Sequence, residues 1–231
     1  MSLLVAKLKP SGSIGLLPLR ADPFRGRMAH HPLSILAHAL PRPGLSTEVN
    51  VWRLKNIPNV WRGLWRIWIA SLFGIPTRYG AVFARVRRGE LGAWTEYGLA
   101  SLRVVTSAGV ADLASRMAGT SAASIANFKF HGFGTGTTAE AAADTALVTE
   151  LTTQYATDST RPTGTQAAST NTYTTVGTLS PDADVAITEH GVFNATSTGT
   201  LWDRSKFSAV NLTGNADSFQ VTYVATFPSG S

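Results

Sequence analysis

The sequence has no cysteine among its 231 residues. This absence excludes disulfide bonds and thiolate metal ligands, and it leaves the redox compartment open. Charge is also scarce, since Asp, Glu, Lys and Arg together make up only 15% of the chain. Thr, Ala, Ser and Gly take the place of many charged surface residues, and such a surface suits burial in an assembly.

Long apolar runs are missing as well. The most apolar stretch, residues 60–75, contains Arg62 and Arg66 and is followed at once by Pro76 and Arg78. A membrane-spanning helix needs about 20 predominantly apolar residues, so we expect no span here.

Recognised catalytic signatures are absent too. The glycine-rich segment 131–138 (HGFGTGTT) lacks the Gly-Lys-Ser/Thr ending of a phosphate-binding loop. His131 and His190 lack the spacing of a zinc site, and the Asp182/Asp184 pair lacks that of a calcium loop. We therefore expect a protein that is not an enzyme and that has no cofactor and no metal site.

What is present is an uneven distribution of charge. Residues 1–100 hold fourteen Lys or Arg and four acids, whereas residues 101–231 hold six basic residues and ten acids. Five of the six tryptophans also lie before residue 100. We divide the chain into a basic, Pro- and Trp-rich N-terminal arm (1–98) and a body (99–231).

Prolines and glycines interrupt residues 1–50 so often that only short helical pieces fit, for example over 33–39. The segment has few ways to bury its own apolar side chains, and ordering it costs much conformational entropy. We expect an extended arm that becomes ordered on a partner. A flexible basic tail is the alternative.

Residues 51–73 differ, because Trp61, Trp65, Trp68 and Leu72 recur at helical spacing. We predict a short amphipathic helix that docks onto protein, since Trp and Arg dominate interface hot spots. Binding of this helix to nucleic acid or to a membrane interface is a weaker alternative, and we expect no membrane among the partners. The residues assigned to partner binding are Trp52, Trp61, Arg62, Trp65, Arg66, Trp68, Arg85, Arg87 and Arg88.

The body begins with a predicted helix over residues 107–117, capped by Thr106 or Ser107, and then becomes mainly β. A helical turn over 139–146 is also expected. The clearest strand covers 218–227, where Phe219, Val221 and Tyr223 alternate with polar residues. Further strands are predicted at 125–132, 147–154, 172–179, 185–193 and 206–212. This spacing indicates an antiparallel β-sandwich or jelly-roll-like body.

Four segments of the body carry a resemblance. They are 128–148 (FKFHGFGTGTTAEAAADTALV), 187–193 (ITEHGVF), 199–207 (GTLWDRSKF) and 217–223 (DSFQVTY). Together they resemble small structural proteins of tailed bacteriophages, including tail-fibre and tail-collar β-domains. The resemblance covers residues from about 98 to 231, and it implies a location in the virion after assembly in the host cytoplasm.

Residues of these motifs also have physical roles. Ile187 and Phe193 are expected to point inward, and Gly191 to permit a bulge or a close approach of strands. Asp203 and Arg204 form a charge pair that can tie a turn to a neighbouring strand. The residues assigned to the fold motif are Ile187, Glu189, Gly191, Phe193, Asp203 and Arg204.

Together these patterns favour a bacteriophage capsid decoration or cement protein. Its arm would staple neighbouring copies of the major capsid protein or other virion proteins, and its body would form a dimer or trimer. A tail, neck or fibre component is the alternative. A carbohydrate-binding module is disfavoured because so few tryptophans lie in the body, and a nucleic-acid-binding protein would depend steeply on salt.

Overall fold

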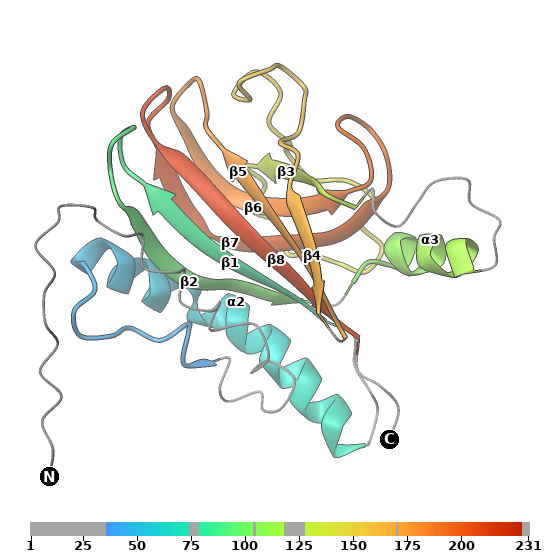
Figure 1. Cartoon of the computed structure of the whole chain (residues 1–231). Coiled ribbons are helices and arrows are strands. Elements are labelled where there is room, and N and C mark those ends of the chain that lie inside the picture. Colours follow the sequence, from blue (N-terminus) through green and yellow to red (C-terminus); the bar gives the residue numbers. More distant parts are fainter. Residues whose placement is uncertain (1–35, 74–78, 104, 118–127, 170, 228–231) are drawn as a thin grey trace, which may run out of the picture.

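The computed structural model describes residues 36–73, 79–103, 105–117, 128–169 and 171–227 (Figure 1). Residues 1–35, the first third of the predicted arm, lie outside the described part. The elements in chain order are α2 (Thr47–Leu72), β1 (Tyr79–Arg87), β2 (Trp94–Arg103), α3 (Ser107–Met117), β3 (Phe130–Gly134), β4 (Thr165–Ser169), β5 (Thr172–Leu179), β6 (Val185–Phe193), β7 (Leu201–Leu212) and β8 (Ser218–Thr226).

The strands form two antiparallel sheets, which confirms the mainly β prediction. One sheet has the order β2-β1-β8-β5-β4, and the other has the order β3-β6-β7. In the central strand β8, the alternating side chains of Phe219, Val221 and Tyr223 are fully buried in the main core. Apolar residues of β6 and β7, among them Ile187 and Phe207, belong to the same core. The layers of strands are visible in Figure 1.

The predicted boundary between arm and body is wrong. It falls between residues 98 and 99, inside β2, and the preceding strand β1 pairs with both β2 and β8. The physical reason lies in the alternation of β1, where Val82, Ala84 and Val86 are buried while Arg85 and Arg87 are only partly buried. The arginines that made this segment resemble a basic arm occupy one face of a core strand.

Several predicted elements are confirmed. The helix over 107–117 and the strands over 172–179 and 185–193 have the observed limits of α3, β5 and β6. The Thr106 hydroxyl caps α3 by accepting a hydrogen bond from Gly109 N at 3.1 Å. The strands predicted over 206–212 and 218–227 are also present, the first within the longer β7. Of the strand predicted over 125–132, residues 125–127 lie outside the described part and β3 begins at Phe130.

Two predicted elements are wrong. Residues 147–154 form no strand, because the Val148 and Thr149 N–H groups bond to the Glu189 carboxylate instead of to a ladder. In place of the helical turn predicted over 139–146 there is a single tight turn, which Asp144 closes on Ala141 through its side chain and its backbone N–H.

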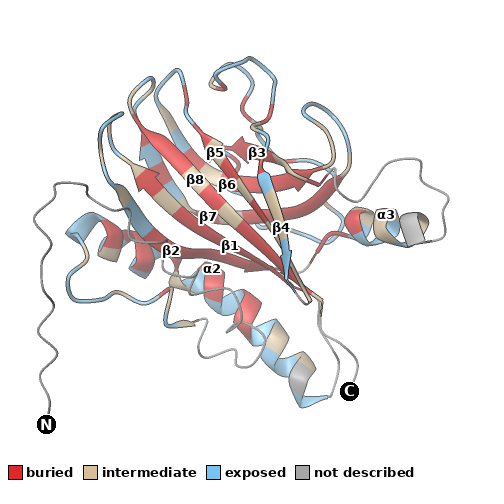
Figure 2. Cartoon of the chain, viewed as in Figure 1, coloured by how far each residue is buried: buried red, intermediate tan, exposed pale blue. Residues whose placement is uncertain are grey.

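Helix α2 covers the outer face of the first sheet near β2 (Figures 1 and 2). Val60 and Leu64 of the helix pack with Leu99 and Leu102 of β2 in a second core cluster. Gly63 lets the helix approach closely, since a Cβ at this position would overlap the Leu102 carbonyl oxygen.

The same helix also closes the gap between the two sheets, because its side chains bond to the free edges of β2 and β7. The Arg53 guanidinium donates to Tyr97 O at 2.8 Å, and Asn56 Nδ2 donates to Ala100 O, both on β2. On β7, Trp52 Nε1 donates to Ser208 O at 2.7 Å, and Asn56 Oδ1 accepts from Ser208 N at 2.9 Å. Three side chains from little more than one turn of α2 therefore satisfy backbone groups of both edges.

Candidate functional site: the outer face of helix α2

Helix α2 is fixed at its start by a local cap. The Ser46 hydroxyl accepts a hydrogen bond from Val49 N at 3.3 Å, and Glu48 lies in the first turn, where the helix dipole favours an acid. The Glu48 carboxylate also bonds to the Tyr97 hydroxyl of β2. These contacts fix the rotation of the helix, so that the direction of each later side chain is set.

The face turned away from the sheet carries an exposed apolar row. Trp61, Trp65 and Leu72 are 54%, 49% and 62% exposed, and the Trp65 ring lies 5.1 Å from that of Trp68, between centroids. The colouring of Figure 2 shows exposed positions on the side of α2 that faces away from the strands. The outer row, as we name it, consists of Val51, Leu54, Pro58, Trp61, Trp65, Trp68 and Leu72.

Cations border the outer row. Lys55, Arg62 and Arg66 are all exposed, and the segment from Val49 to Phe73 contains no Asp or Glu. The outer face of α2 is thus apolar along its middle and positively charged along one side. Surfaces that combine exposed Trp with Arg are typical of binding sites.

The structure brings together only part of the residues predicted to bind a partner. Trp61, Arg62, Trp65, Arg66 and Trp68 share the outer half of α2.

Trp52 is buried and bonded to β7, so its assignment to partner binding is wrong. The other three arginines lie on or just after β1, apart from the outer row. Arg88 forms ion pairs with Asp217 at 2.7 Å and with Glu48, and Arg87 donates to the Ser218 hydroxyl. Arg85 lies over the Trp94 ring, 4.6 Å from its centroid. These arginines are engaged in contacts within the protein.

The fold-motif residues form a buried ionic centre. Glu189 on β6 and Arg204 on β7 are buried and paired, with Arg204 Nε 2.8 Å from the Glu189 carboxylate. The same carboxylate accepts hydrogen bonds from the N–H groups of Gly136, Val148 and Thr149. All its acceptor positions are therefore used to hold two loops against the sheet.

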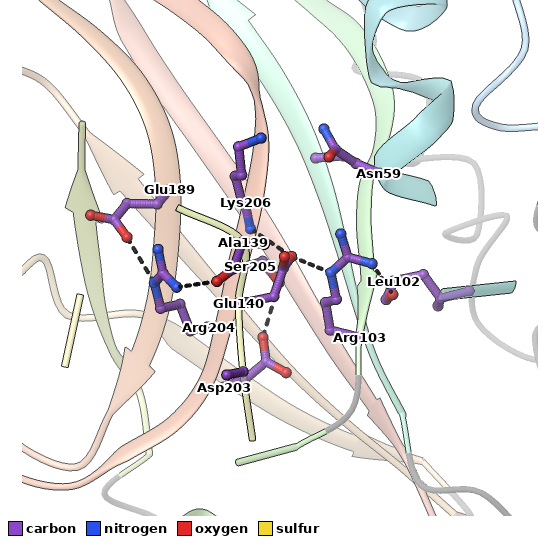
Figure 3. A network of polar contacts seen from close by, with 12 residues as sticks. Asn59, Leu102, Arg103, Ala139, Glu140, Glu189, Asp203, Arg204, Ser205 and Lys206 are labelled. Atoms are coloured by element: carbon purple, nitrogen blue, oxygen red, sulfur yellow. Dashed lines mark hydrogen bonds and ion pairs between the residues drawn. The ribbon is translucent and has the colours of Figure 1, made fainter. Parts of the chain in front are cut away.

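Arg204 also holds the neighbouring loop in place, and Figure 3 shows part of its contacts. Its guanidinium donates to Thr138 O at 3.0 Å and pairs with Asp144 at 2.9 Å. Arg204 thus ties a turn to neighbouring strands through Glu189 and Asp144, and the predicted charge pair between Asp203 and Arg204 is wrong. Ile187 and Phe193 are buried, and a Cβ on Gly191 would crowd Leu201 and Phe193.

Asp203 points into a different part of the interior, beside the Arg103 and Glu140 pair (Figure 3). One carboxylate oxygen accepts from the Ser205 hydroxyl at 3.0 Å, and the other has no hydrogen-bond partner within the described residues. Burial raises the pKa of Asp203 to about 7.

The two histidines of the body are also buried, and they contact each other. His131 Nδ1 lies 2.9 Å from His190 Nε2, and His131 Nε2 lies 3.0 Å from the Thr175 hydroxyl. Burial lowers the pKa of His131 to about 3, and burial together with His131 holds the pKa of His190 well below its usual range. The pair is neutral and links the two sheets, because Thr175 lies on β5.

Sequence reasoning missed part of the site. Val51 and Leu54 extend the outer row toward the start of the helix, and Ile69 and Phe73 add exposed apolar surface near its end. Val51 and Leu54 could have been found from the alternating spacing of three and four residues between apolar positions, which continues through Pro58. Arg53 and Asn56 gave no recognisable signal, because their function depends on the strand edges that they meet.

Two further searches return nothing in the described part of the chain. No group of three or more His, Asp or Glu residues there is arranged to hold a metal ion. Neither of its helices is long and apolar enough to span a membrane.

Comparisons with known proteins add no relative. No family model matches the chain, and searches of curated proteins and of solved structures find no match.

Proposed function

We propose that this protein is a non-enzymatic structural component of a bacteriophage virion, and within the virion a capsid decoration or cement protein. The outer row of α2 carries this proposal. It presents exposed tryptophans on a helix whose opposite face is bonded to both sheets, so that a partner would meet a preformed surface.

The interior supports a structural rather than a catalytic function. Glu189, Arg204, Asp203, His131 and His190 are charged or titratable groups of the motif region, and these five are buried. Glu189 and Arg204 bond to each other and to loops of the same chain, and His131 contacts His190, so these groups help to hold the fold. The body therefore supplies rigidity, and the helix supplies the contact.

The segment before Pro32 gives the proposal its second support, from sequence alone. It holds Lys7, Lys9, Arg20, Arg25 and Arg27 against a single acid, Asp22. A basic arm of this kind would add contacts to neighbouring capsid subunits, and linked contacts increase affinity through effective concentration.

The proposal is tested by the copy number and position of this chain in purified particles. Quantitative gel analysis and electron microscopy should find many copies distributed over the shell. A few copies at one vertex or along the tail would assign it to the tail, neck or fibre instead. Its absence from particles would contradict any virion function.

A variant pair tests whether the outer row makes the contact. Trp61→Ala with Trp65→Ala should reduce incorporation into particles, while Leu91→Ala should not. Leu91 is a suitable control because it is fully exposed and lies in the connection between β1 and β2. Equal incorporation of both variants would exclude the outer row as the contact.

A further inference from the structure

The spacing of the outer row carries information beyond its exposure. Its positions, 51, 54, 58, 61, 65, 68 and 72, are separated alternately by three and four residues over three heptads. This is the a and d pattern of a coiled coil, with Val51, Pro58, Trp65 and Leu72 at a and Leu54, Trp61 and Trp68 at d. The row extends for about 30 Å along the helix.

The packing of α2 on the body does not explain this pattern. The contacts with β2 and β7 are made by Trp52, Arg53, Asn56, Val60 and Leu64, which occupy other heptad positions. Core packing therefore accounts for the inner side only. A second, independent heptad pattern on the outer side indicates a helical partner.

We propose that the outer row is one half of a two-helix contact, and that the other half is an amphipathic helix of a different protein with acidic residues beside its apolar seam. The inference rests on the proposed function only for the partner being another virion protein. The acidic charge of the partner helix is inferred from Lys55 and Arg62, which occupy successive e positions, and from Arg66 nearby. Cations at e select acids at the facing g positions of the partner.

A second copy of this chain fits less well. The segment 49–73 offers no carboxylate to meet Lys55 and Arg62, and its g positions are Ile57, Leu64 and Ser71. Two copies would also bring like charges together on chains that each have a net charge of +6.

A lipid surface also fits less well. A helix that lies in a membrane interface presents a broad apolar face, whereas here Lys55 and Arg62 directly border the row, and only its end, at Ile69 and Phe73, is broader. The size of the tryptophans adds a constraint on the partner helix. Its seam should carry small residues opposite Trp61, Trp65 and Trp68, because large and small side chains must alternate across a packed contact.

The test uses the full-length protein and two synthetic peptides. Both peptides are 28-residue amphipathic helices with Leu and Ala at a and d; one has Glu at e and g, and the other has Lys there. Fluorescence anisotropy of labelled peptide measures binding. The acidic peptide should bind at least about tenfold more tightly than the basic one.

Two variants locate the binding site. Trp61→Ala with Trp65→Ala should weaken binding of the acidic peptide at least about tenfold, and Leu91→Ala should leave it unchanged. A variant with Lys55→Glu, Arg62→Glu and Arg66→Glu should reverse the preference and bind the basic peptide. Circular dichroism checks that each variant keeps its fold.

Three results would overturn the proposal. One is the binding of neither peptide, or equal binding of both. Another is dimerisation of the protein that is lost in the tryptophan variant, since it would assign the row to a second copy. The third is binding to phosphatidylglycerol vesicles through the same tryptophans, which would assign it to a membrane. Peptide binding without incorporation into particles would instead refute the virion proposal and leave the helical contact standing.

Discussion

Helix α2 contains the same short motif three times, with opposite results. An apolar residue, Trp and Arg follow one another at 51–53, 60–62 and 64–66. In the first copy Trp52 and Arg53 are buried and bonded to strand edges, whereas in the second Trp61 and Arg62 are exposed. Nine residues separate Trp52 from Trp61, which corresponds to two and a half helical turns and therefore to opposite faces.

The difference shows that the position of a residue around the helix axis, and not its type, decides whether it stabilises the fold or lies on the exposed surface. Trp52 was assigned to partner binding because it lies near the other tryptophans in the sequence. A helical projection separates the two, since Trp52 lies on the same face as Asn56, and Trp61 on the same face as Trp65.

The strongest test of this comparison replaces one tryptophan of each kind. Trp52→Ala should lower the free energy of unfolding by about 3–5 kcal/mol, because it opens a cavity in the main core and leaves Ser208 O without its donor. Trp61→Ala should change it by no more than about 0.5 kcal/mol. Urea unfolding followed by circular dichroism measures both, and equal losses would contradict the assigned faces.

The arginines provide the next test. Arg53→Ala should cost about 1–3 kcal/mol, because it leaves the carbonyls of Tyr97 and Leu40 without this donor. Arg62→Ala should have almost no effect on stability, since its side chain is exposed. The comparison fails if Arg62→Ala destabilises as much as Arg53→Ala.

Gly63 tests how closely the inner face approaches the sheet. In an open helix Gly→Ala gains about 1 kcal/mol, but here the new methyl group would overlap Leu102 O. We expect Gly63→Ala to lower the free energy of unfolding by about 1–3 kcal/mol, as overpacking does. A stabilised variant would show that the helix lies farther from β2.

Buried charge in the body should make stability depend on pH, whereas exposed charge on α2 should affect partner binding. The pKa of Asp203 is raised from 3.8 to about 7 on folding, so the folded protein keeps a proton that the unfolded chain releases within this pH window. The contribution of Asp203 to stability is therefore complete below about pH 4 and is lost as the pH rises to about 7. The outer cations predict instead a salt dependence of partner binding.

The measurement compares wild type and Asp203→Asn at pH 5 and pH 8. His131 and His190 act in the opposite direction, because their pKa values are lowered from 6.5 and they lose stability as the pH falls. Both proteins keep these histidines, so the difference isolates Asp203. On going from pH 5 to pH 8, wild type should lose at least about 1 kcal/mol relative to the variant. An identical pH profile would contradict the raised pKa.

Local patterns predicted those parts of the fold whose signal is local. The alternation in β6 and β8 and the capped helix α3 were found because each element carries its own periodicity. β1 and β2 were missed, since Arg85, Arg87 and Arg88 gave this region the composition of a basic arm. The short strand β4, with the sequence TQAAS, has too little apolar character to be recognised.

Contacts between distant residues were beyond the sequence. Glu189 and Arg204 were identified as fold residues, but their pairing depends on the register of β6 on β7, in which Gly191 faces Arg204. The Glu189 carboxylate also explains why the strand predicted over 147–154 is absent, because it accepts hydrogen bonds from the N–H groups of Val148 and Thr149. For the candidate site, the sequence predicted Trp61, Trp65 and Trp68, and it could not predict which side of the helix the sheets would cover.

The covered edges of β2 and β7 should affect how the protein behaves at high local concentration. A free strand edge recruits other strands, and aggregation through such edges grows with local concentration. Where copies of this chain lie close together, open edges at β2 and β7 would add to those of β3 and β4 and favour aggregation. Trp52, Arg53 and Asn56 prevent this by occupying the edge groups from within the same chain. Helix α2 would thus keep neighbouring copies from pairing at β2 and β7, while its outer row remains free for a helix of a different protein.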